Sequence, residues 1–261
     1  MILQTGYEAR MAIRKEDWTA PTPGLAPGYT QANLVILPKE YALDFFLFCQ
    51  RNPKPCPVLD VTDPGSFQTV LFAKDGDVRT DIPRYRIYRD GVLEKEVLNI
   101  KDYWRDDLVA FLIGCSFSFE NALTEAGVPI RHIEENVNVP MYITNIETIP
   151  GGMFSGPMVV SMRPIPADQV DLAVKITGML PQVHGAPVHI GDPKEIGITD
   201  INNPDFGDAV TIKDGEVPVF WACGVTPQAA IMKVKPSFVI THAPGYMMIG
   251  DILDKELMIR C

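Results

Sequence analysis

Two cysteines occupy corresponding positions in two similar stretches of the sequence. Residues 111–123 have the pattern of a strand, a loop that contains Cys115, and a helix, and residues 219–231 repeat this pattern around Cys223. A thiol beside a helix N-terminus has a lowered pKa and reacts as a thiolate, whereas many free cysteines are simply small buried residues. Cys115 and Cys223 are therefore candidates for either role, and the two units are candidates for equivalent halves of one sheet.

Hydroxyl side chains follow both cysteines at the start of the predicted helices. Ser116 and Ser118 come after Cys115, and Thr226 comes after Cys223. A helix N-terminus carries unpaired N–H groups and a partial positive charge, so it can hold a carboxylate without a cationic side chain. Two such turns facing one cleft would suit a dicarboxylate. The alternative for Ser118 and Thr226 is a role as helix caps.

Two of the four histidines lie in one segment rich in glycine and proline, residues 184–193. His184 and His189 are candidates for a general acid or base, because histidine titrates near neutral pH. With Asp192 they could instead bind a divalent metal ion, and a purely structural role is the third possibility. His242, which follows the second cysteine unit, is a further candidate for a catalytic acid.

Two other residues are candidates for substrate binding. Arg131 could form a bidentate pair with a substrate carboxylate, although an internal salt bridge with Glu134 or Glu135 is the commoner outcome. Asn33, beside a proline-rich loop, is a weaker candidate.

No cofactor motif is present in the sequence. It contains no phosphate-binding loop with its lysine, no Rossmann glycine triplet and no nucleophile elbow, which argues against nucleotide hydrolysis, a dinucleotide cofactor and a serine hydrolase. Cys49 and Cys56 lack a second pair of ligands, so zinc is not expected there. We expect no cofactor, and a divalent metal is the one alternative left open.

The charge of the chain restricts its partners. The 261 residues have a formal net charge of -10, which disfavours nucleic-acid binding but permits an anionic small molecule in a locally positive pocket. No apolar run is long enough for a membrane span, and the five cysteines suggest free thiols in a reducing compartment. We expect a cytoplasmic protein that binds a small carboxylate, and a homodimer, as is common for acidic enzymes of this size.

Strand and helix patterns alternate along the chain. Strands are predicted at residues 58–61, 69–72, 84–88, 142–146, 158–162, 217–223 and 238–241, and a strand or a helix end at 32–37. Helices are predicted at residues 5–16, 39–50, 119–126, 168–179 and 227–234, and a hairpin turn at 89–91. Strands such as 217–223 are apolar on both faces, which favours an α/β fold with a mainly parallel or mixed sheet covered by helices. Residues 1–141 and 200–261 would form the main domain, and residues 142–199 a smaller inserted α+β subdomain.

Several long strings of the sequence resemble the D-glutamate cyclase family. They are residues 26–38, 48–56, 113–120, 138–142, 184–193, 218–228 and 240–245, so that the resemblance runs from about Leu25 to Asp251. The resemblance implies a two-part α/β fold and a hydro-lyase. For eukaryotic relatives it implies conversion of D-glutamate to 5-oxo-D-proline and water.

The candidate residues suggest how such a ring closure would proceed. One helix N-terminus, with Ser116 and Ser118 or with Thr226, would hold the α-carboxylate, and the other would stabilise the oxyanion. His184 or His189 would deprotonate the ammonium group, and His242 or a cysteine would protonate the departing oxygen. Two alternatives remain open: an amino-acid racemase or epimerase that uses Cys115 and Cys223, and a small-acid binding protein without catalysis.

Overall fold

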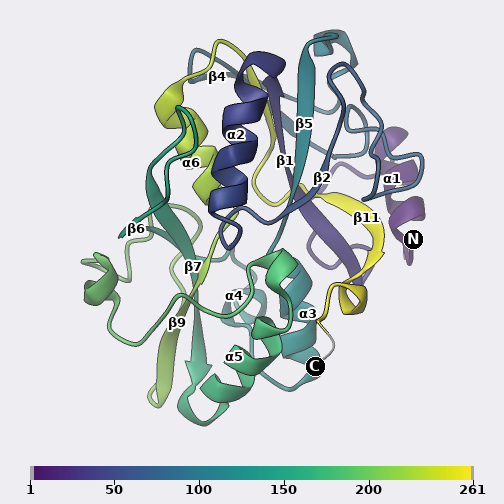
Figure 1. Cartoon of the computed structure of the whole chain (residues 1–261). Coiled ribbons are helices and arrows are strands. Elements are labelled where there is room, and N and C mark those ends of the chain that lie inside the picture. Colours follow the sequence, from purple (N-terminus) through teal and green to yellow (C-terminus); the bar gives the residue numbers. More distant parts are fainter. Residues whose placement is uncertain (1–2, 260–261) are drawn as a thin grey trace.

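The computed structural model describes residues 3–259, and Figure 1 shows its helices and strands. The helices are α1 (Gly6–Arg14), α2 (Lys39–Arg51), α3 (Phe117–Glu125), α4 (Arg131–Glu134), α5 (Val170–Gly178) and α6 (Val225–Val234). The strands are β1 (Tyr29–Pro38), β2 (Val58–Val61), β3 (Tyr85–Arg89), β4 (Val92–Val97), β5 (Leu108–Gly114), β6 (Met141–Glu147), β7 (Pro157–Pro166), β8 (His189–Ile190), β9 (Glu216–Ala222), β10 (Val239–His242) and β11 (Met248–Leu253). Among these helices, none has both the length and the apolar character needed to cross a membrane.

The larger sheet is built around β1, which pairs with β5, β10 and β11. Its order is β2-β5-β1-β10-β3-β4, and β11 also pairs with β1. The register of β1 with β5 runs without a break from Ala32 opposite Gly114 to Pro38 opposite Leu108. Every strand pair in the described residues is antiparallel. The prediction of a mainly parallel or mixed sheet is therefore wrong, whereas the mixture of helices and sheets is as predicted.

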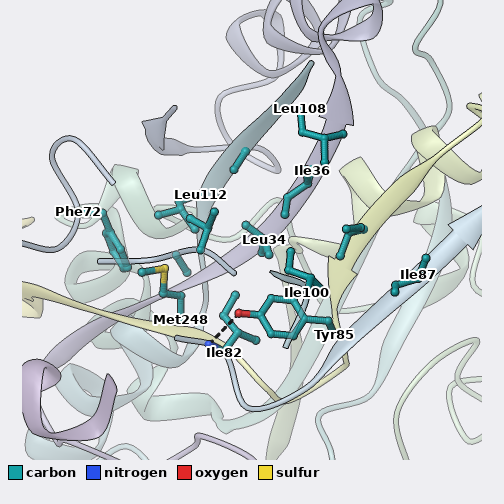
Figure 2. Packing of buried hydrophobic residues seen from close by; sticks show 14 of the residues in the cluster. Leu34, Ile36, Phe72, Ile82, Tyr85, Ile87, Ile100, Leu108, Leu112 and Met248 are labelled. Atoms are coloured by element: carbon teal, nitrogen blue, oxygen red, sulfur yellow. Dashed lines mark hydrogen bonds between the residues drawn. The ribbon is translucent and has the colours of Figure 1, made fainter. Parts of the chain in front are cut away.

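Both antiparallel sheets contain apolar strands that are covered on both faces. In the smaller sheet, Val219 and Trp221 of β9 lie in one buried cluster and Phe220 lies in another. The larger sheet is covered in a similar way. Val35 and Leu37 of β1 pack with α2 and α6, which lie over one face. Leu34 and Ile36 face the other way, into the cluster shown in Figure 2, which is covered by residues of the irregular stretch between β2 and β3. Because both faces are covered, β5 and residues 34–37 of β1 are apolar throughout, as they would be in a parallel sheet.

The stretch between β2 and β3 contains an expected strand that does not form. Residues 69–72 were predicted as a strand, but the N–H groups of Val70, Leu71 and Phe72 all donate to the buried carboxylate of Asp60, at 2.8–2.9 Å. A segment whose N–H groups converge on one carboxylate cannot donate them to a neighbouring strand. In Figure 2, Phe72 from this segment packs in the cluster, and the Ile82 N–H donates to the Tyr85 hydroxyl at 3.1 Å.

The smaller sheet has the order β6-β7-β9-β8. It includes β9, so it draws on residues from both sides of the predicted boundary at position 199. The division into a main domain and an inserted subdomain stays a prediction.

Candidate active site

The two cysteine loops meet where the two sheets adjoin. β5 ends at Gly114 in the larger sheet and leads through Cys115 into α3, and β9 ends at Ala222 in the smaller sheet and leads through Cys223 into α6. Both cysteines line one small cavity of about 50 Å³. The idea that the two units are halves of one sheet is wrong, because β5 and β9 belong to different sheets.

The correspondence between the two units nevertheless extends into their helices. Three residues after each cysteine, a buried hydroxyl accepts a hydrogen bond from a strand N–H: Ser118 Oγ from Gln31 at 3.3 Å and Thr226 Oγ1 from Val159 at 2.9 Å. Neither hydroxyl caps its helix or lines the small cavity. Their contacts instead join each helix to a strand.

Asn33 lies between the two loops. Its Nδ2 donates to the carbonyl oxygens of Gly114, at 3.0 Å, and Ile113, at 3.3 Å. A Cβ atom at Gly224 would lie 2.4 Å from the same Nδ2, and one at Gly114 would lie 2.1 Å from the Gln182 carbonyl oxygen. Glycine at both positions therefore allows β1, the two loops and the segment before His184 to approach closely.

His242 is the last residue of β10 and lines the small cavity. One of its ring nitrogens already accepts a hydrogen bond. The Leu34 N–H donates to His242 Nδ1 at 3.0 Å, a shorter contact than the 3.3 Å to the Leu34 carbonyl oxygen. Nδ1 is therefore the acceptor, and in the neutral ring Nε2 carries the proton. Burial lowers the pKa of His242 to about 4, with a smaller contribution from Arg86.

His184 lines the same cavity with the opposite tautomer. Its Nδ1 lies 2.9 Å from the Lys54 carbonyl oxygen, which can only accept, so the proton is on Nδ1 and Nε2 has a free lone pair. Burial lowers the pKa of His184 to about 4 and outweighs the carbonyls of Lys54 and Gly114, which raise it. The cavity thus contains two neutral imidazole rings: His242, with its proton on Nε2, and His184, with its proton on Nδ1.

The thiols are in their protonated form. Burial raises the pKa of Cys115 to about 12, although the Phe117 N–H and the charge of Arg163 act in the opposite direction. Burial also raises the pKa of Cys223, against the N–H groups of Val225 and Gly224. The N–H groups at each helix N-terminus therefore do lower the pKa of the thiol, as expected. The loss of solvation on burial raises the pKa by more.

A buried ion pair lies next to the cavity. Arg163, on β7, donates to Glu120 Oε1, to Ser161 Oγ at 2.9 Å and to Ser116 Oγ at 3.0 Å. His132 Nε2 lies 3.3 Å from the same Glu120 oxygen. Burial would raise the pKa of Glu120, but the charges of Arg163 and His132 hold it below its usual value. This network fixes the position of Ser116 and of the first turns of α3.

A larger cleft of about 580 Å³ adjoins the small cavity. The two spaces share Phe117, Asn138, Pro244 and Gly245 in their walls. The remaining wall of the cleft comes from the proline- and glycine-rich residues 21–27, from the start of β1, from α3, and from α4 and the residues that follow it. A molecule bound in the small cavity can therefore extend into the cleft.

Four of the predicted site residues do not line the small cavity. Besides Ser118 and Thr226, they are Arg131, whose guanidinium pairs with Glu216 and, at 3.5 Å, with Glu134, and His189, whose Nε2 lies 2.8 Å from the Asp192 carbonyl oxygen. Within residues 3–259, no three His, Cys, Asp or Glu side chains are grouped as a metal site. The other six candidates, Asn33, Cys115, Ser116, His184, Cys223 and His242, come together around the cavity.

Arg163, Glu120 and Gln228 were missed in the sequence. Arg163 and Ser161 are two residues apart in an otherwise apolar strand, which places both on one face and was a usable signal. Glu120 and Gln228 each stand five residues after a cysteine, so the repeat itself pointed to them. Gln228 lines the small cavity and Glu120 the cleft.

Comparisons with known proteins show which family the chain belongs to. A sequence profile described as D-glutamate cyclase matches residues 109–251. A Geobacillus kaustophilus protein named "Putative hydro-lyase" is 62% identical over 250 residues, 96% of this chain and 95% of that protein. A Thermoanaerobacter sp. (strain X514) protein named in the same way is 66% identical over 250 residues, 96% of this chain and 94% of that protein. A solved structure, of a nitrogen repressor-like protein from Methanococcus jannaschii, is 11% identical with a TM-score of 0.38 over 95% of this chain and 99% of that one, a likeness too low to carry an argument. By the profile match and by identity over nearly its whole length, this chain belongs to the D-glutamate cyclase family.

Proposed function

We propose that this protein is a hydro-lyase that closes D-glutamate to 5-oxo-D-proline with loss of water. The observation that carries the proposal is the pairing of His184 and His242, two neutral histidines of opposite tautomer in one cavity. Ring closure moves two protons from the α-ammonium group to the departing γ-oxygen and places negative charge on the γ-oxygen that stays, so it needs a proton acceptor and a hydrogen-bond donor. Family membership supports the same reaction.

The N-termini of α3 and α6 would supply partial positive charge to the anionic groups of the substrate. The first N–H groups of α6, with the Gln228 amide, would hold the α-carboxylate, and those of α3, with the Ser116 hydroxyl, would stabilise the oxyanion. Buried Arg163, which is paired with Glu120, holds Ser116 in place for this role. Because the small cavity has room for about one or two water molecules, the rest of the substrate would extend into the cleft.

The two tautomers give the two histidines different roles in the reaction. His184 Nε2 takes a proton from the α-ammonium group and passes it to a γ-oxygen, which leaves a neutral α-amine beside a γ-carboxylic acid. The amine nitrogen then attacks the γ-carbon, His184 Nε2 takes the second proton and passes it to the departing oxygen, and the carbon–oxygen bond breaks with release of water. His242 Nε2 keeps its proton and donates a hydrogen bond to the γ-oxygen that stays. Bound carboxylate would raise the pKa of both rings above their values in the free protein, which brings them closer to the working pH.

The test is proton NMR in deuterated buffer with D-glutamate, L-glutamate and both 5-oxoproline enantiomers, with metal-stripped and metal-supplied protein. We expect interconversion of the D pair alone, and loss of about 10²-fold or more in rate in His184→Gln and His242→Gln. His189→Gln, outside the cavity, is the control. Folded His184→Gln and His242→Gln proteins with full activity would exclude this mechanism.

A second candidate, an amino-acid racemase, is favoured by one observation. Cys115 and Cys223 line the same cavity from two opposing units, as two thiols must to exchange an α-proton on opposite faces. The raised pKa of both thiols opposes it. Solvent deuterium at the α-carbon, lost in either Cys→Ser variant, would identify the racemase.

A further inference from the structure

We propose that the preferred substrates are γ-amides of D-glutamate, whose amine substituent occupies the large cleft. This inference rests on the proposed function, because it uses the same ring closure. The reacting end of the molecule would lie in the small cavity. The amine would leave through the shared wall at Phe117, Asn138, Pro244 and Gly245 into the cleft.

Size is the first argument. The cleft encloses about 580 Å³, within the range of about 300–1,000 Å³ typical of sites for drug-sized ligands. A departing water molecule needs only about 30 Å³. A site built to release water alone has no use for a cleft of this size, whereas the leaving amine of a γ-amide would fill part of it.

Charge is the second argument. Among the described residues that line the cavity and the cleft, none is a lysine or an arginine. Glu120, on the cleft wall, is paired with buried Arg163, so the two together contribute no net charge there, and the whole chain has a net charge of -10. D-glutamate brings two carboxylates into this site, whereas a γ-amide brings one carboxylate and a neutral carbonyl. The neutral γ-carbonyl is also much more readily attacked by an amine than a carboxylate is.

The chemistry of the wall indicates what kind of amine fits. Leu25, Ile133 and Val137 provide apolar surface, and amide side chains between them provide hydrogen-bond donors and acceptors, namely Gln31, Asn121, Asn136 and Asn138. This combination suits an uncharged, partly apolar substituent with peptide-like polar groups.

The reaction balances without any further reactant. The α-amine nitrogen forms a bond to the γ-carbon while the γ-carbon–nitrogen bond of the amide breaks. His184 Nε2 takes the proton that the attacking nitrogen loses and gives it to the leaving nitrogen, while His242 Nε2 keeps its proton and donates a hydrogen bond to the γ-carbonyl oxygen. The products are 5-oxo-D-proline and a free amine.

The experiment compares D-glutamate with its γ-methylamide and γ-benzylamide, and with the L-γ-benzylamide, by NMR of ring and released amine. We expect kcat/KM for the D-γ-benzylamide to exceed that for D-glutamate by about tenfold or more. Cyclisation of D-glutamate with no release of benzylamine would overturn the inference and leave the proposed function standing. Release of benzylamine without cyclisation of D-glutamate would support the inference and remove the water-forming reaction. No reaction of either compound would overturn both.

A pair of variants tests the place of the substituent. Ile133→Trp adds bulk to the cleft wall from a side chain that is 57% exposed, and Ile149→Trp makes the same change at a site outside the cleft that is 59% exposed. The ratio of kcat/KM for the benzylamide to that for the methylamide should fall by about tenfold in Ile133→Trp and stay unchanged in Ile149→Trp. An equal ratio in both variants would show that the cleft does not hold the amine.

Discussion

Gly224 lies directly against the side-chain amide of Asn33, since a Cβ atom at position 224 would be 2.4 Å from Asn33 Nδ2. Asn33 is on β1 of the larger sheet, and Gly224 follows β9 of the smaller sheet. The same Nδ2 donates to the Gly114 carbonyl oxygen at 3.0 Å. One buried amide thus joins the loops that carry Cys115 and Cys223.

We expect Gly224→Ala to destabilise the protein by about 2 kcal/mol or more, because the added methyl group displaces Asn33 from its buried hydrogen bonds. The measurement is the free energy of unfolding in urea. Gly156→Ala is the matched control, since a Cβ atom there meets nothing within 4 Å, and its effect should stay within about 1 kcal/mol. Equal stability of the two variants would contradict the contact.

The buried histidines predict a loss of stability in mild acid. His184 and His242 have a pKa of about 4 in the folded protein and about 6.5 when unfolded. Between these values the unfolded chain binds more protons, so the free energy of unfolding falls as the pH drops below about 6.5, by about 2 kcal/mol per histidine from pH 7 to pH 5.

The variant His242→Gln separates the loss of stability caused by this histidine from the loss caused by carboxylates, which also take up protons as the pH falls. Its loss of stability between pH 7 and pH 5, measured by urea unfolding at both values, should be about 2 kcal/mol smaller than that of the wild type. His189→Gln, which replaces a half-buried histidine outside the cavity, should keep the wild-type loss. The prediction fails if His242→Gln and the wild type lose the same stability.

Alkylation should reveal the protonated state of the thiols. With a pKa of about 12, Cys115 should react with iodoacetamide at pH 7.5 about 10³-fold more slowly than a free cysteine, because only the thiolate reacts. Mass spectrometry of the labelled peptide gives the rate, and the same protein in urea is the control. Rapid labelling of folded protein at Cys115 would contradict the raised pKa of this thiol and favour the racemase.

Breaking the buried ion pair should be costly. Arg163→Met leaves the Glu120 charge buried beside His132 alone, and we expect a loss of about 3–5 kcal/mol in the free energy of unfolding. The double variant Arg163→Met/Glu120→Gln should recover part of that loss, because no unpaired charge remains. Arg89→Met, which breaks an exposed pair with Glu94, should cost about 1 kcal/mol or less. An additive double variant would show that the two residues are not coupled.

Much of the local structure could be predicted because its signals are local. The strand predicted at residues 58–61 has the bounds of β2, and the helix predicted at 39–50 corresponds to α2. The turn Arg89-Asp90-Gly91 is confirmed as the β3–β4 hairpin, with positive φ at Asp90 and Gly91. Turn residues and apolar periodicity act over a few residues, so they can be read without knowledge of the partners.

Strand direction was decided only in the tertiary structure. An apolar run shows that both faces of a strand are covered, but not whether helices or an irregular stretch cover them. Here α2 and α6 cover one face and residues between β2 and β3 contribute to the other. The sequence therefore could not distinguish a parallel sheet from this antiparallel one.

The sequence by itself determined that Cys115, Cys223 and the nearby polar residues are candidates for the site, because residue type and spacing are written in it. Only the tertiary structure decided that His184 and His242 meet at these cysteines while His189 does not, since long-range packing brings β1, β10 and the segment after α5 together. Burial also reversed the expected pKa shift of Cys115, and desolvation is a property of the folded environment rather than of neighbouring residues in the chain.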